Sequence, residues 1–251
     1  MAAKPLSGQA TVVTGAAKNI GREIALTLAA DGAGVVINGK SDRAAADAVV
    51  AEIGAQGGTA VVHMADIADP NQAEGLIRAA IDAFGRLDIL ILNAGIRRQN
   101  SIVNIPLEEW REVMTMDLEA PFVLARAALP HMLENGYGRI VTLGGTSAHT
   151  GNVGRAHVGA AKMGLLSLTR SIAMEFGPQG VTANMVAPGH VDTVRGAAAG
   201  QRSNSGAGRP IQRMGTTREI AAMVRHLCGP DGAYITGQCL HVDGGIYLGG
   251  A

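Results

Sequence analysis

The chain has 251 residues, 47% of them hydrophobic and 17% charged, so it can build a large core and is not expected to be disordered. The 21 basic and 21 acidic residues cancel, which removes any charge-based argument for nucleic acid or a membrane surface as a partner. The two cysteines lack metal or disulfide spacing, the start has no apolar signal segment, and no apolar run has bilayer length, so we expect a cytoplasmic protein without a metal site.

Short apolar segments alternate with segments of helical periodicity along the chain. Strands are expected at residues 10–14, 34–38, 59–63, 87–92, 139–143, 181–186 and 240–242, and helices at 20–30, 43–53, 71–84, 107–134 and 158–176. Such alternation is typical of a parallel sheet with helices on both faces. We therefore predict an α/β fold: a single domain over residues 1–251 with a doubly wound, seven-stranded parallel sheet.

One segment interrupts this alternation. Residues 192–212 are rich in Gly, Ser, Ala and Arg and lack the periodicity of a core element. They follow the sixth expected strand, and ligands of doubly wound sheets bind beyond the carboxyl ends of the strands. We therefore expect this segment to be a mobile flap over a substrate site.

A glycine-containing loop, TGAAKNIG at residues 14–21, joins the first strand to the first helix. Gly15 permits a tight turn, and Gly21 permits close packing of the helix against the strand. The helix N-terminus offers N–H groups and the positive end of its dipole to a pyrophosphate. A glycine pair in this context predicts a dinucleotide site.

The same loop resembles the Thr-Gly-x-x-x-Gly-x-Gly motif of the short-chain dehydrogenase/reductase family. Further segments resemble family motifs in the family's order, from about residue 6 to residue 248: ADI at 65–67, NAG at 93–95, PGHVDT at 188–193, YITGQ at 234–238 and VDGG at 242–245. Asn19 stands where the family usually has glycine, a departure that a positive φ accommodates. The resemblance implies a Rossmann-type fold and an oxidoreductase that uses NAD or NADP.

The resemblance also implies roles for individual residues at the cofactor. Asp66 would accept from the adenine amino group, and Lys162 would bind the nicotinamide ribose. Pro188, Val191 and Thr193 would hold the nicotinamide. The full predicted cofactor set is Gly15, Lys18, Asn19, Ile20, Gly21, Lys40, Ser41, Asp66, Ile67, Asn93, Ala94, Gly95, Lys162, Pro188, Gly189, Val191 and Thr193.

The end of the second strand favours NADP(H) over NAD. A dinucleotide fold selective for NAD usually has an acidic residue here for the ribose 2′-hydroxyl, and none occurs before Asp42. Lys40 and Lys18 would instead pair with a 2′-phosphate, and Ser41 would hydrogen-bond it.

The positions that carry the chemistry depart from the family pattern. The family uses a tyrosine as proton donor, a lysine four residues later that lowers the pKa of the tyrosine, a serine thirteen residues before the tyrosine and an asparagine further upstream. Here these positions hold Val158, Lys162, Gly145 and Asp117. We therefore expect an atypical member that lacks the usual catalytic serine and tyrosine.

Several residues are candidates to replace the missing groups. Lys162, His157, Asp117 and Ser147 form the predicted catalytic set, although His157 would lie about 100° around the helix from Val158. Thr146 and Ser147 are expected in a turn after the strand at 139–143. Other open candidates are His149, Thr146, Arg155 and His190.

These observations leave three functions open. We favour an NADP(H)-dependent oxidoreductase acting on a small carbonyl, alcohol or imine substrate with a non-standard proton donor. The alternatives are a non-redox enzyme on the same fold, such as a lyase or hydrolase-like enzyme, and a cofactor-binding protein without catalysis. The resemblance also implies a homotetramer or homodimer that associates through the helices at 107–134 and 158–176.

Overall fold

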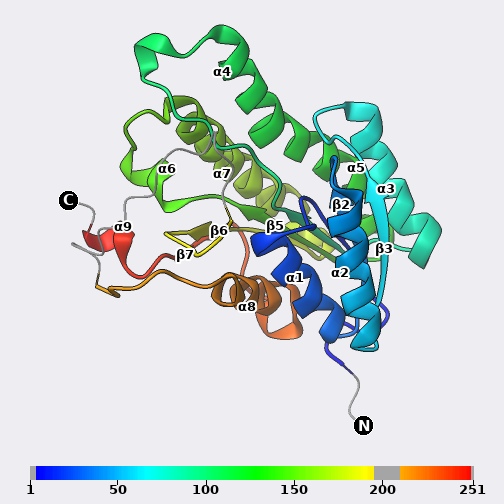
Figure 1. The fold of residues 1–251 in the computed structure, drawn as a ribbon. Coiled ribbons are helices and arrows are strands. Elements are labelled where there is room, and N and C mark those ends of the chain that lie inside the picture. Colours follow the sequence, from blue (N-terminus) through cyan, green and yellow to red (C-terminus); the bar gives the residue numbers. More distant parts are fainter. Residues whose placement is uncertain (1–3, 195–209, 250–251) are drawn as a thin grey trace.

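The computed structural model describes residues 4–194 and 210–249, and its centre is one seven-stranded parallel sheet (Figure 1). The strands lie in the order β3-β2-β1-β4-β5-β6-β7. Their bounds are β1 Ala10–Val13, β2 Gly34–Gly39, β3 Thr59–Met64, β4 Ile89–Leu92, β5 Gly138–Leu143, β6 Val181–Pro188 and β7 Cys239–Val242. All neighbouring strands pair in parallel, which confirms the predicted doubly wound sheet.

Helices cover both faces of this sheet. They are α1 Asn19–Ala30, α2 Arg43–Ala55, α3 Pro70–Phe84, α4 Leu107–Met114, α5 Ala120–Glu134, α6 Thr146–Thr150, α7 Ala156–Phe176, α8 Thr217–Cys228 and α9 Ile246–Gly249. The strand order reverses between β1 and β4, where the chain moves from one half of the sheet to the other. Folds of this kind bind ligands beside that reversal, at the carboxyl ends of the strands.

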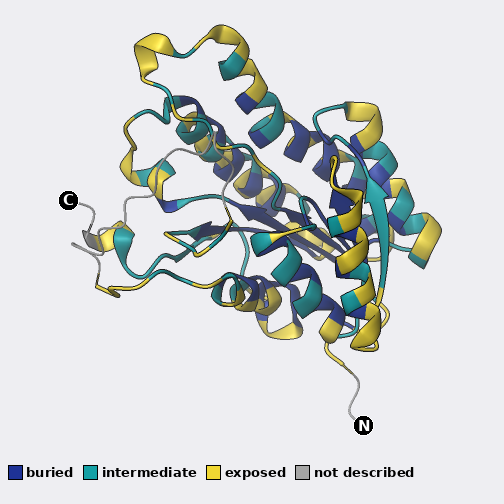
Figure 2. Ribbon diagram, viewed as in Figure 1, coloured by how far each residue is buried: buried dark blue, intermediate teal, exposed yellow. Residues whose placement is uncertain are grey.

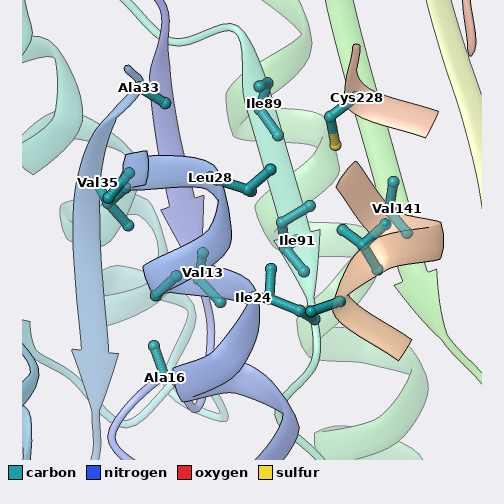
Figure 3. Close-up of a cluster of buried hydrophobic side chains, with 14 of the residues drawn as sticks. Val13, Ala16, Ile24, Leu28, Ala33, Val35, Ile89, Ile91, Val141 and Cys228 are labelled. Atoms are coloured by element: carbon teal, nitrogen blue, oxygen red, sulfur yellow. The ribbon is translucent and has the colours of Figure 1, made fainter. Parts of the chain in front are cut away.

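Two hydrophobic cores lie on opposite faces of the sheet, because successive side chains of a strand point to opposite faces. Val13 belongs to the core under α1, α2 and α8, whereas its neighbour Val12 belongs to the core under α3, α5 and α7. Figure 3 shows the first core, in which Ile24 and Leu28 of α1 point toward Ile91 and the sheet. Burial is concentrated in the strands and in the inner faces of the helices (Figure 2).

The structure departs from the predicted elements at several places, and the helices α8 and α9 were not among those expected from the sequence. The expected helix at 107–134 contains a π-helical segment, Thr115–Glu119, between α4 and α5. Residues 146–150 form the short helix α6, whereas the sequence predicted a turn at Thr146 and Ser147. Of the expected flap at 192–212, residues 195–209 lie outside the described residues. No helix among the described residues is long and apolar enough to span a membrane.

The glycine at position 21 lets α1 pack directly onto the ends of β1 and β4. A Cβ atom there would overlap the carbonyl oxygen of Gly15 and would lie 2.5 Å from Nδ2 of Asn93. The Gly15 oxygen is backbone, and Asn93 Nδ2 is held by its hydrogen bonds to the carbonyl oxygens of Thr14 and Gly15, so neither atom gives way without loss.

We therefore predict that Gly21→Ala destabilises the protein by about 2 kcal/mol, the usual cost of overpacking. Gly54→Ala is the matched control, because Gly54 also lies in a helix, α2, and a Cβ there meets no atom within 4 Å. The control is expected to gain about 0.5 kcal/mol from better helix propensity. Equal losses of unfolding free energy in urea for both variants would contradict the packing argument.

Candidate active site

A pocket of about 840 Å³ opens at the carboxyl edge of the sheet. Residues that follow β1, β4, β5 and β6 line it, together with the first turns of α7. This volume lies in the usual range for a small-molecule or cofactor site. The lining includes Ile20, Asn93, Gly95, Asp117, Gly144, Gly145, Thr146, Ser147, Arg155, Val158, Lys162, Pro188, Gly189, His190, Val191 and Ile246.

The glycine loop at one side of the pocket has the conformation that the sequence predicts. Gly15 has a φ of +62°, and Asn19 takes the left-handed conformation with a φ of 54°. The helix α1 begins at Asn19, and the preceding Lys18 makes no side-chain capping hydrogen bond. The N-terminus of α1 is therefore left to other acceptors, as a phosphate-binding helix requires.

A buried threonine connects this loop to the segment after β4. The Thr14 hydroxyl donates to the carbonyl oxygen of Ile91 at 3.1 Å and accepts from the N–H groups of Asn93 and Ala94 at 2.9 and 3.0 Å. Asn93 Nδ2 donates to the carbonyl oxygens of Thr14 and Gly15. The predicted cofactor residues Asn93 and Ala94 therefore shape the glycine loop itself.

The far side of the loop is closed by the end of β2. Asn38, 2% exposed, accepts from the Gly15 N–H and donates to the carbonyl oxygens of His63 and Ala65. Neither Asn38 nor Thr14 was among the predicted site residues. A polar side chain at the end of an otherwise apolar strand is the signal that would have identified both.

Two predicted cofactor residues contact each other beyond β2. Lys40 Nζ lies 2.7 Å from Oδ2 of Asp66, and the Asp66 Oδ1 accepts from the Ala68 N–H at 3.1 Å. The hydrogen bond from Lys40 lowers the pKa of Asp66, so this carboxyl is ionised. Lys18, Lys40 and Ser41 are all exposed at this side of the loop.

Asn19 links the glycine loop to the chain after β6. Its Nδ2 donates to the carbonyl oxygen of Val194 at 2.9 Å, and its Oδ1 accepts from the Val194 N–H at 3.0 Å. The residue that departs from the family's glycine thereby joins two loops at the mouth of the pocket.

A buried ion pair lies at the floor of the pocket. Lys162 Nζ of α7 is 3.3 Å from Oδ2 of Asp117, whose side chain is 1% exposed. The Asp117 Oδ1 accepts from the Ile96 N–H at 2.8 Å. Asp117 lies in the π-helical segment, and such insertions into α-helices often occur at functional sites.

Two small or apolar residues that the sequence analysis assigned to the family's serine and tyrosine positions face this pocket. Gly145 and Val158 both line it. A Cβ atom at Gly145 would meet no atom within 4 Å, so the position has room for a side chain. Ser147 is exposed and lines the pocket, whereas the buried Thr146 hydroxyl lies 3.1 Å from Oδ2 of Asp243.

The structure does not bring His157 to the pocket. Its ring is fully buried, and Nε2 lies 3.1 Å from Oε1 of Glu109 on α4. The helix α7 begins at Ala156, so the ring already points inward when Val158 faces the pocket. Arg155 and His190, in contrast, line the pocket.

His149 also lies outside the pocket lining, beside the last strand. Its Nε2 is 3.5 Å from Sγ of Cys239, and its ring packs edge-on against His241. Burial and the nearby His241 and Arg170 lower the pKa of His149. Burial raises the pKa of the Cys239 thiol.

Comparison with known proteins identifies the family. Residues 15–247 match the family model described as "Enoyl-(Acyl carrier protein) reductase". The 3-oxoacyl-[acyl-carrier-protein] reductase of Synechocystis is 39% identical over 249 residues, which cover 97% of this chain and 98% of the relative. The protein of the same description from Escherichia coli is 39% identical over 243 residues, covering 96% of this chain and 98% of the relative.

Solved structures give the same result. A blue fluorescent protein from a metagenomic library, in complex with NADPH, superposes with a TM-score of 0.90 at 39% identity, covering 96% of this chain and 98% of that chain. A short-chain dehydrogenase from Burkholderia cenocepacia, in complex with NADP, superposes with a TM-score of 0.88 at 36% identity and the same coverage. By its sheet order, its glycine loop and these full-length relatives, the chain belongs to the short-chain dehydrogenase/reductase family.

Proposed function

We propose that the chain is an NADP(H)-dependent oxidoreductase that transfers hydride to or from a small carbonyl, alcohol or imine substrate without the family's usual serine and tyrosine. The observation that carries this proposal is the pair of Lys162 and the buried Asp117 at the floor of a pocket bounded by the glycine loop. The residues expected to bind the cofactor match the family motifs, whereas the positions expected for the family's serine and tyrosine hold Gly145 and Val158.

The residues at the glycine loop fit a phosphorylated dinucleotide. The N-terminus of α1 carries no side-chain cap, so its N–H groups suit the pyrophosphate. Lys18, Lys40 and Ser41 are exposed beside it, and no acid stands between the end of β2 and Asp42 to bind a 2′-hydroxyl. The structural relatives carry NADPH and NADP in their complexes, which supports the same cofactor here.

When bound, the nicotinamide supplies or accepts the hydride, and the protein must handle the proton. Reduction of a carbonyl leaves a negative charge on oxygen, and the Lys162 ammonium stabilises that charge and donates a proton to it. Asp117 holds the ammonium in place through the 3.3 Å contact. Ser147 offers a hydroxyl to the substrate oxygen, and Lys162 regains its proton from solvent through the open pocket.

An imine substrate lessens the need for a proton donor. A protonated imine arrives with the proton already in place and accepts hydride directly at carbon. Val158 and Gly145 leave additional room beside Lys162 for such a substrate.

The alternatives are a non-redox enzyme on this fold and a cofactor-binding protein without catalysis. The cofactor motifs are complete, which favours a cofactor-binding protein over a non-redox enzyme. Measurements of NADPH turnover and NADPH binding together separate all three.

Restoring the family residues tests the role of Asp117. In the wild-type background, we expect Asp117→Asn to lower the rate of NADPH oxidation by about 10²-fold, since it removes the charge that positions the Lys162 ammonium. In a Gly145→Ser/Val158→Tyr background, the same substitution completes the family's set, so we expect it to leave the rate unchanged or raise it. The assay is NADPH absorbance with a panel of 3-oxoacyl thioesters, ketones, quinones and imines.

Three results would contradict the proposal. Equal losses on Asp117→Asn in both backgrounds would give Asp117 a structural role only. NADPH oxidation by the restored variant alone, with the wild type binding NADPH but inactive on every substrate, would make the natural protein a cofactor-binding protein. A wild type that does not bind NADPH would leave the non-redox alternative.

The cofactor preference is tested at Lys40. We expect Lys40→Met to weaken NADPH binding by about tenfold or more, because a charged hydrogen-bond partner of the 2′-phosphate is removed. NADH binding should change little, since NADH has no 2′-phosphate. Fluorescence titration with both cofactors provides the measurement, and Lys4→Met is the surface control. Equal loss of affinity for NADPH and NADH would contradict the assigned role.

We also propose that copies of the chain associate through α5 and α7. Phe122, Met163 and Met174 on these helices are 45%, 40% and 82% exposed, and large apolar side chains gathered on a surface favour association. Sedimentation should show a dimer or tetramer that Met174→Glu dissociates, whereas Val103→Glu, at an exposed position outside both helices, should leave it intact. A monomeric wild type would contradict the proposal.

A further inference from the structure

Three side chains of types that often bind metal ions, from two distant parts of the sequence, meet beside β7. Cys239 and His241 alternate along the strand and therefore share one of its faces. His149 comes from α6, ninety residues before Cys239. One ligand atom from each of these residues lies within 4.8 Å of the others.

The two distances from the histidine nitrogens to the Cys239 sulfur are near those of a tetrahedral ion. Nε2 of His149 lies 3.5 Å from Sγ of Cys239, and Nε2 of His241 lies 3.9 Å from the same sulfur. Zinc binds sulfur at about 2.3 Å and imidazole nitrogen at about 2.0–2.1 Å, which places neighbouring tetrahedral ligands roughly 3.5 Å apart. The cluster therefore needs only small side-chain adjustments to surround an ion.

The second nitrogen of His241 already has the partners of a metal-bound histidine. Its Nδ1 lies 3.4 Å from the Thr146 hydroxyl and 3.9 Å from Oδ2 of Asp243. A metal-bound imidazole commonly directs its other nitrogen to a carboxylate or similar acceptor, which fixes the ring and its tautomer. This arrangement leaves Nε2 of His241 to face Cys239 and His149.

The surrounding groups hold these partners in place. Asp243 accepts from the N–H groups of Gly245 and Tyr247 at 2.8 and 2.9 Å, and its side chain is 6% exposed. The Tyr247 ring stacks on His241 with centroids 4.2 Å apart. The carboxylate and the aromatic ring thus restrict His241 to one orientation.

We propose that His149, Cys239 and His241 bind a zinc-class divalent ion through two imidazoles and one thiolate, with water as the fourth ligand. Soft thiolate and imidazole ligands in a tetrahedral arrangement select zinc over magnesium or calcium. The ion ties α6 to β7. Because Ser147 and Ala148 of α6 line the pocket, it fixes one wall of that pocket. The proposal does not depend on hydride transfer.

Cobalt and zinc titrations of the chelator-treated full chain test this site. Co²⁺ should bind at one equivalent per chain, with the near-ultraviolet absorption of a thiolate-to-cobalt bond, and Zn²⁺ should displace it. Cys239→Ser should abolish that absorption, and His149→Ala should weaken Zn²⁺ binding by at least about tenfold. His226→Ala, an exposed histidine on α8, is the control and should bind as the wild type does.

A second measurement avoids dependence on the folding of the variants. In the wild type, Zn²⁺ should slow alkylation of Cys239, quantified by peptide mapping, while the fully buried Cys228 serves as the internal reference. Failure of Zn²⁺ to protect Cys239 would overturn the proposal. So would one-equivalent binding that Cys239→Ser and His149→Ala leave unchanged.

Discussion

The hydroxyl of Thr14 is the contact on which the carboxyl edge of this sheet depends. It is completely buried and makes three hydrogen bonds, one to the end of β4 and two to the loop after it. Those bonds hold β1 and β4 together at the point where the strand order reverses. The glycine loop, the N-terminus of α1 and the pocket floor are all positioned relative to this junction.

The charged groups at this site are of two kinds, exposed lysines beside the glycine loop and a buried ion pair in the pocket. Lys18 and Lys40, the cations predicted to bind the cofactor, are exposed beside the glycine loop, where solvent screening keeps each contact weak and exchangeable. At the pocket floor the Lys162 ammonium lies against the buried Asp117 carboxylate, and removing either partner of such a pair costs folding stability. Val158 and Gly145 line the same pocket and bring no hydroxyl to it.

The sequence predicted the fold well because strand and helix periodicities are local. The glycine loop and the positive φ of Asn19 were likewise recognisable from neighbouring residues. Contacts between distant segments were not: nothing local shows that Lys40 meets Asp66 or that His149 meets Cys239. The position of His157 could not be predicted for a different reason. The residue at which α7 begins decides whether His157 or Val158 faces the pocket, and the sequence does not fix that residue.

Glu109 on α4, which contacts His157 on α7, is followed in the chain by an intrinsic fluorophore. The chain contains one tryptophan, Trp110, which follows Glu109 in α4 and is half-buried. Its indole emission therefore reports on α4, the helix that packs against the Lys162-bearing α7. A rearrangement around α4 can therefore be followed as a shift in the emission of this one residue, without labelling the protein.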